Sequence, residues 1–193
     1  MQKREFLAKS ALSLGAAMLL LSGCSTTPLS SSPKGADKKR EIDDGVNATL
    51  DRLYSTVSGS HELVSKARGV LVFPSVLAAG FVVGGEYGEG ALRVNGKTMD
   101  YYSTVTGSFG LQIGAQSKAI IFLFMTPQAL DKFTSSKGWT AGVDASVAAI
   151  KVGANGAVDL NTATKPVSVI IMTNQGLMAN LNVEGTKITK LQQ

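Results

Sequence analysis

Few side chains in this 193-residue chain could do acid–base or nucleophilic chemistry. There is one histidine, His61, and one cysteine, Cys24, so a multi-histidine metal site and an intrachain disulfide are both excluded. His61 stands between Ser60 and Glu62, but nothing in the sequence marks the nucleophile and the orienting group that a catalytic triad needs. We therefore interpret His61 as a partly exposed helical residue.

Two pairs of carboxylates are the remaining candidates for metal or acid–base chemistry. Asp43 and Asp44 most simply complement the start of a helix, where negative charge is favourable. Glu86 and Glu89 could bind a cation, and the competing interpretation is solvated surface. The sequence thus favours a protein that is not an enzyme and needs no cofactor, metal or small-molecule substrate. A hydrolase with an unrecognised site stays an alternative.

Cys24 ends the motif Leu21-Ser22-Gly23-Cys24, which resembles the bacterial lipobox. Three basic residues near the N-terminus precede an uncharged stretch at 11–21. This stretch is too short to span a bilayer, for which about 20 residues are needed. We predict that residues 1–23 are a lipoprotein signal peptide and that Cys24 is the lipidation site.

Residues 24–35 are predicted to be a flexible tether, because they are rich in Ser and Pro and have almost nothing to bury. Ser25 follows the cysteine in place of Asp, which by resemblance to the sorting rule favours the outer membrane. The expected location is the bacterial cell envelope, lipid-anchored and facing the periplasm or the cell surface. Without residues 1–23 the chain has 16 basic and 13 acidic residues, and this net charge of +3 gives no case for nucleic acid.

Residues 36–193 are predicted to form one α+β domain, in which N-terminal amphipathic helices precede a mostly antiparallel, glycine-rich β-sheet with one further helix. Apolar residues recur at spacings of three and four over 42–57, which is typical of an amphipathic helix. A second helix is expected at 61–68, capped by Ser60. A third is expected from Pro127 to about Ser136.

The strands are expected to be short and separated by turns. Asn95-Gly96 is typical of a two-residue hairpin turn, and Glu184-Gly185 suits another. Nine glycines between 80 and 114 indicate bulges, tight bends and close backbone approach, because the lysine and the helix of a phosphate-binding loop are missing. The expected strands are 69–74, 81–85, 90–95, 98–106, 107–116, 119–125, 139–152, 167–173, 177–183 and 186–191.

Three motifs in this region together resemble one known family. They are Lys66-Ala-Arg-Gly-Val-Leu-Val-Phe-Pro74, Gly84-Gly-Glu-Tyr-Gly-Glu-Gly-Ala-Leu92 and Gly107-Ser-Phe-Gly-Leu-Gln-Ile-Gly-Ala-Gln116. On these motifs the chain resembles the SYLF domain, also called the YSC84-like or Ysc84 actin-binding domain, over roughly 41–190. The eukaryotic members resemble phosphoinositide binders and some are associated with actin, whereas bacterial members resemble lipoproteins that bind phospholipid.

Basic residues match the family's basic part in position, and we predict that they bind lipid: Lys38, Lys39, Arg40, Lys66 and Arg68. Basic charge at a helix start opposes the helix dipole, so the first three do not serve helix stability. The leading hypothesis is a non-catalytic, membrane-associated lipoprotein whose partner is anionic phospholipid. The alternative is a structural or interaction module bound to an envelope or host protein, whose acyl group only localises it.

Overall fold

The most apolar run of the sequence forms the centre of a β-sheet. The computed structural model describes residues 35–80, 83–109, 117–150, 157–158, 165–173, 176–177 and 183–192. Strand β4 (Ser117–Phe124) is buried without interruption over residues 119–124. Successive residues of this strand belong in turn to two hydrophobic clusters, one on each face of the sheet: Ile121 belongs to one and Phe122 to the other. Because it has core on both faces, this strand is apolar throughout.

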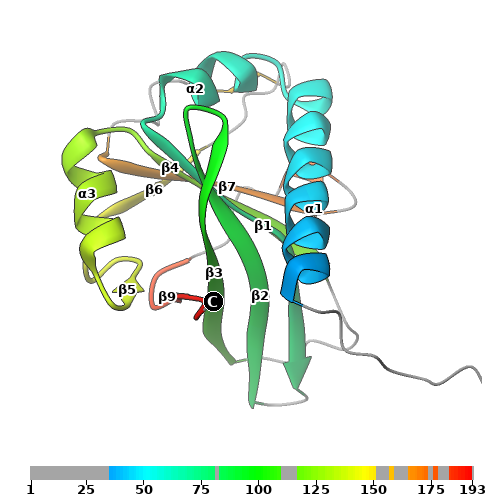
Figure 1. Ribbon diagram of the computed structural model, residues 1–193, viewed down its shortest axis with the longest axis vertical. Helices are drawn as coiled ribbons and strands as arrows, with labels where there is room; N and C mark the ends of the chain where they lie inside the picture. The colour runs from blue at the N-terminus through cyan, green and yellow to red at the C-terminus, as the bar shows by residue number, and fades with distance from the viewer. Residues whose placement is uncertain are drawn as a thin grey trace, which may run out of the picture. The chain divides into compact units, whose positions relative to one another are not determined.

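Helices cover both faces of this sheet (Figure 1). The described helices are α1 (Gly35–Thr56), α2 (Ser60–Lys66) and α3 (Pro127–Ser135). The cluster on one face includes Leu53 of α1 and Leu63 of α2, and the cluster on the other includes Phe133 of α3. Both clusters lie within Pro33–Gln193, which form one compact unit. The three helices predicted from the sequence are therefore confirmed.

The start of α2 differs from the prediction in one detail. Gly59 precedes the helix in the left-handed conformation, with φ at 79°, and no side chain caps the helix there. Ser60 is the first helical residue, and its hydroxyl donates backward to the carbonyls of Leu53 and Val57. The prediction of Ser60 as the cap was wrong, because its side chain closes the end of α1 instead. Thr126 does cap α3, accepting a hydrogen bond from the Ala129 amide at 3.2 Å.

The sheet is mixed. Its order is β5-β9-β3-β2-β1-β4-β7-β6, with β8 also paired to β7. The described strand pairs are antiparallel except β6 with β7, which run parallel. The α+β class is thus confirmed, with a mixed sheet. The remaining strands are β1 (Gly69–Gly80), β2 (Val83–Val94), β3 (Lys97–Phe109), β5 (Trp139–Thr140), β6 (Val147–Ala149), β7 (Val167–Thr173), β8 (Gly176–Leu177) and β9 (Lys187–Lys190).

The sheet curls, so that strands distant in its order meet. Trp139 of β5 lies 5.9 Å from Phe122 of β4 between ring centroids, although four strands separate β5 from β4 in the sheet order. Phe133 of α3 packs against Trp139 at 5.7 Å and against Phe124 of β4 at 4.7 Å, again between ring centroids. This aromatic cluster fills the concave side of the curl.

Glycines and one bulge let the first strands bend. The sequence predicted that this strand ends at Pro74, but β1 continues to Gly80. A register shift between Val72 and Ser75 accommodates the proline ring. Opposite the bulge, a Cβ on Gly90 would lie 2.0 Å from the Val72 carbonyl oxygen. The predicted close backbone approach is therefore confirmed here. β2 is one strand where two were predicted.

Turns in the second half separate the strands more than the sequence suggested. The predicted strand 139–152 is divided into β5 and β6 by a turn in which Gly142 has a φ of 82°. The turn predicted at Glu184-Gly185 is present, since the Thr186 amide donates to the Val183 carbonyl at 3.1 Å, and β9 after it pairs with β3 and β5. Most of the strand predicted before this turn, at 178–182, lies outside the described residues. The Asn95-Gly96 hairpin joins β2 and β3 as predicted, with both residues at positive φ.

Several predicted features lie outside the described residues. They are the signal peptide, Cys24, the tether up to residue 34, and the parts of predicted strands at 81–82, 110–116, 151–152 and 178–182. α1 begins at Gly35, the residue at which the predicted tether ends.

Candidate functional site

α1 carries the basic cluster at 38–40, and its apolar stripe fixes where that cluster lies. Ile42, Val46 and Leu53 are buried against the sheet at helical spacings. The cluster therefore falls in the first two turns of α1, beside the start of this stripe. Arg40 is exposed there, and within the described part of the chain it forms no ion pair.

Lys38 is engaged with the sheet. Its Nζ lies 2.8 Å from Glu89 Oε1 in β2, and the Tyr87 hydroxyl donates to the same oxygen at 2.6 Å. Burial raises the pKa of Glu89, but the hydrogen bonds from Lys38 and Tyr87 and the charge of Lys38 outweigh it, and the net pKa is lowered. Burial and the bond to Glu89 raise the pKa of Tyr87 to about 12. The charge of Lys38 is thus largely matched by Glu89.

Lys39 lies at the edge of a hollow between α1, β3 and the C-terminal segment. Its Nζ is 5.4 Å from the centroid of the Tyr101 ring, within the range of a cation–π contact. The hollow has a volume of about 370 Å³, and its apolar lining includes Ala36, Ile42 and Leu191. An apolar hollow with ammonium groups at its edge suits an amphiphile that carries negative charge.

Asp43 joins α1 to the β2–β3 hairpin. Its carboxylate accepts hydrogen bonds from Thr98 and Tyr101, both at 2.7 Å, and pairs with Arg93 at 3.6 Å. Burial and the bond to Asp43 raise the pKa of Tyr101 to about 12. The interpretation of Asp43 as a complement to the helix start was wrong, because α1 begins eight residues earlier and the dipole effect falls off within the first turn.

Glu86 and Glu89 do not form a cation site. They lie on opposite faces of β2, since they are three positions apart and side chains alternate along a strand. Glu86 is 7% exposed and pairs with Lys118 at 2.7 Å, so its interpretation as solvated surface was also wrong. Across the described residues, no group of three metal-ligating side chains comes together.

The structure separates the two groups of predicted lipid-binding residues. Lys66 is the last residue of α2, and Arg68 follows the helix. α2 packs against the C-terminal end of α1 through His61 and Tyr54, whose ring centroids are 4.9 Å apart. Tyr54 comes sixteen positions after Lys38 in α1, which is about 24 Å along the helix at 1.5 Å per residue. Lys66 is exposed and pairs with Glu62 at 2.6 Å, so it does not extend the surface at 38–40.

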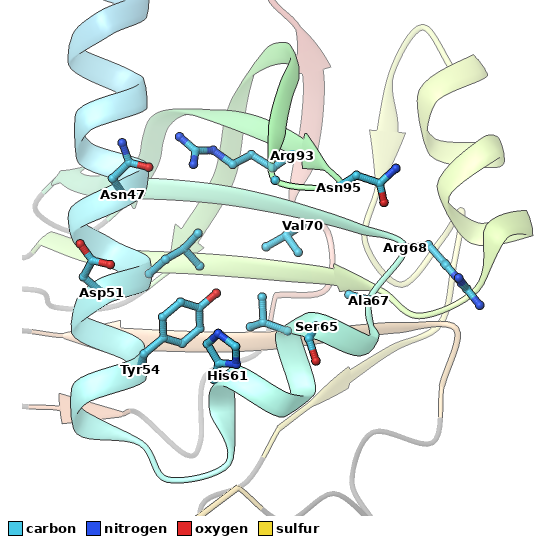
Figure 2. Close-up of a pocket in the computed structure, with 13 residues that line it drawn as sticks. Asn47, Asp51, Tyr54, His61, Ser65, Ala67, Arg68, Val70, Arg93 and Asn95 are labelled. Atoms are coloured by element: carbon cyan, nitrogen blue, oxygen red, sulfur yellow. The ribbon is translucent and has the colours of Figure 1, made fainter.

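A second pocket, of about 430 Å³, lies between α1, α2 and the β2–β3 hairpin. Figure 2 shows the Tyr54 hydroxyl and the Arg93 side chain directed into it, with Asp51 on α1. Arg68 stands at its far end and points away from Asp51. His61 is exposed on α2, as interpreted from the sequence. The pocket holds polar groups of both charges that could bind a polar ligand.

The partners of the basic cluster were missed by the sequence analysis. Glu89 is 51 residues from Lys38 in the chain, and Tyr101 is even more remote from Lys39. Strand alternation along β2 was the usable pattern, since it places Glu89 two residues from Ala91 and on the same face as α1.

None of the described helices is long and apolar enough to cross a membrane.

Comparison with protein families finds a match in the second half of the chain. Residues 105–193 match the family Ysc84, described as "Las17-binding protein actin regulator". The matched region runs from β3 to the C-terminus, so it includes Leu191 but not α1. The curated proteins contain no match to this chain.

Proposed function

We propose, from the match of residues 105–193 to the Ysc84 family, that this chain is a non-catalytic lipoprotein that binds anionic phospholipid at the bacterial envelope. The family consists of binding modules and is linked to actin and to lipids. Of these two kinds of partner, lipid is the one that an exported bacterial protein meets in its own envelope. Acylation at Cys24 and location at the outer membrane, facing the periplasm or the cell surface, belong to the same proposal.

One observation carries the proposal: the basic start of α1 stands beside an apolar hollow. Lys38 and Lys39 both line the hollow, whose floor includes Ile42 and Tyr101. Arg40 is exposed one residue further along the helix. Positive groups at the edge of an apolar surface complement the phosphate and the acyl region of an anionic lipid.

The contacts reduce the electrostatic contribution that a plain charge count suggests. A basic residue near an anionic surface contributes roughly 1 kcal/mol. Because Glu89 offsets Lys38, only Lys39 and Arg40 act at full strength. Two charges give about 2 kcal/mol, or roughly a 30-fold gain in affinity for anionic over zwitterionic vesicles.

Vesicle sedimentation tests this function. The chain from Pro33 onward should bind phosphatidylglycerol-containing vesicles better than phosphatidylcholine vesicles. Changing residues 38–40 to Gln should weaken this binding by roughly 30-fold and flatten its salt dependence. The matched control removes three charges elsewhere and should bind as the parent does: Lys97→Gln, Lys132→Gln and Lys137→Gln.

Two results would contradict the proposal. Equal binding by the parent and the 38–40 variant at low salt would move the lipid contact away from the start of α1. No binding of either vesicle by the parent would favour the alternative, an envelope interaction or structural module that uses its acyl group only for location.

A further inference from the structure

Three large apolar side chains lie side by side on the surface of the sheet. Leu77 in β1, Tyr87 in β2 and Val105 in β3 are 52%, 50% and 50% exposed. Tyr87 is the register partner of both Leu77 and Val105. Register partners project from the same face of a sheet, so the three side chains form one continuous exposed row.

The exposed row lies on the face that α1 covers, beyond the start of the helix. Along β2, alternate residues on this face change from buried Ala91, through ion-paired Glu89, to half-exposed Tyr87. Lys38 contacts Glu89 and lies three residues after the start of α1 at Gly35. Figure 1 shows β1, β2 and β3 continuing past this end of α1. The helix therefore covers the sheet up to the level of Glu89 and leaves the exposed row open.

The charges beside the exposed row favour an anionic surface. On this face of β2 the neighbouring carboxylate is Glu89, and Lys38 at 2.8 Å offsets its charge. Glu86, next to Tyr87 in the chain, lies on the opposite face and pairs with Lys118. Val105 is the register partner of Lys187 in β9, which is exposed. An apolar row with an exposed lysine at one end and a tyrosine in the middle has the composition of a surface that enters the membrane–water interface.

We propose that Leu77, Tyr87 and Val105 insert into the headgroup region of an anionic phospholipid bilayer. This inference rests on the proposed function and names the surface of the domain that meets the lipid. The basic start of α1 lies beside the exposed row, so electrostatic attraction and apolar insertion act on the same area of membrane.

The length and composition of the preceding segment support the bilayer as the occupant. Gly35 comes eleven positions after Cys24, a reach of at most about 40 Å. The exposed row therefore stays close to a membrane that holds an acylated Cys24. Between these two residues, Leu29 is the one large apolar side chain, too little to cover three half-exposed side chains.

Sedimentation with vesicles of phosphatidylglycerol and phosphatidylcholine tests the exposed row. In the chain from Pro33 onward, Leu77→Thr with Val105→Thr should weaken binding by about tenfold or more, because apolar area is lost. The salt dependence should persist, since the basic residues are unchanged. The control Met99→Thr with Val143→Thr alters side chains that are 60% and 79% exposed elsewhere, and it should bind as the parent does.

Fluorescence gives a second measurement that does not depend on the threonine variants. Tyr87→Trp should show a blue-shifted emission with vesicles, and brominated lipid should quench it. The parent, whose one tryptophan, Trp139, is buried, supplies the background and should change little.

The outcomes separate this inference from the proposed function. A parent that binds no vesicles overturns both. Vesicle binding that the threonine pair leaves unchanged, or an emission of the Tyr87→Trp variant that vesicles do not shift, overturns the exposed row alone. If sedimentation velocity shows that the parent dimerises and the threonine pair does not, the row is an interface between copies of the chain and the inference is overturned.

Discussion

All four tyrosines of the chain hold their protons more firmly than a free phenol does. Burial is the first cause at each, and a neighbouring carboxylate is the second. The pKa is raised to about 12 at Tyr87, Tyr101 and Tyr102, and it is also raised at Tyr54. These hydroxyls therefore stay protonated at neutral pH, and those of Tyr87 and Tyr101 donate to Glu89 and Asp43.

The tyrosine pKa values predict a loss of stability in alkali. The unfolded chain releases its phenolic protons near pH 10. Between about pH 10 and 12 the unfolded state binds fewer tyrosine protons than the folded state, so the free energy of unfolding falls as pH rises. Ultraviolet absorbance of tyrosinate should show a native midpoint well above that of the chain in guanidinium chloride. A native midpoint near 10 would contradict these hydrogen bonds.

The sequence identified the basic residues of the candidate site but not what they contact. Lys38, Lys39 and Arg40 are conspicuous because three positive charges precede an apolar stripe. That Glu89 offsets one of them depends on β2 passing beneath α1, 51 residues later in the chain. Strand alternation indicates that Glu89 shares a face with Ala91, but it does not indicate which helix covers that face, since the tertiary arrangement determines this.

At the scale of elements, Gly90 is predicted to be intolerant of any side chain. A Cβ there would lie 2.0 Å from the Val72 carbonyl oxygen and 2.7 Å from the Phe73 ring, and the first of these is backbone. Gly90→Ala should therefore lower the free energy of unfolding by about 3 kcal/mol, measured by urea denaturation.

A matched change elsewhere in the sheet shows whether the cost comes from this close approach. A Cβ on Gly107 in β3 would meet nothing within 4 Å. Gly107→Ala should alter the free energy of unfolding by no more than about 0.5 kcal/mol. Equal losses at the two positions would mean that β1 does not approach Gly90 as closely as the structure has it.

Elements with strong local patterns were predicted well. The helices follow from apolar spacing and the Thr126 cap, and β4 follows from its unbroken apolar run. Pro74 misled the prediction because a proline inside a bulge does not end a strand. The prediction divided β2 into two strands because its glycines are typical of turns. In the structure, Gly88 and Gly90 lie within the strand and allow the backbone of β1 to approach closely.

At the scale of the whole molecule, the curl of the sheet could not be predicted. Trp139 belongs to a two-residue strand that the sequence merged with the residues after it, and its position follows from pairing with Ile188 of β9. β9 in turn pairs with β3, so the chain's last strand brings the aromatic cluster together. On the α1 side, none of the described helices covers the parts of β1, β2 and β3 that run past the start of α1, and Leu77 and Tyr87 are exposed there.

Two modes of membrane attachment are then expected to act together. Acyl chains contribute roughly 0.8 kcal/mol per buried methylene group, and a single chain holds a protein only marginally. The basic start of α1 and the exposed row would supply a weaker, salt-dependent attachment. Their combination would keep the domain against the bilayer instead of at the end of its tether.

Loss of the acyl attachment is the last prediction. Cys24→Ser should abolish incorporation of a labelled fatty acid and cleavage before residue 24, and it should leave the domain folded, because both hydrophobic clusters lie after Pro33. The control Ser30→Ala changes the tether outside the motif and should keep both label and cleavage. Since the chain has one cysteine, label retained in Cys24→Ser would have to sit on another type of residue. Such a result would refute the lipidation site, while the vesicle binding of the domain could still be tested on its own.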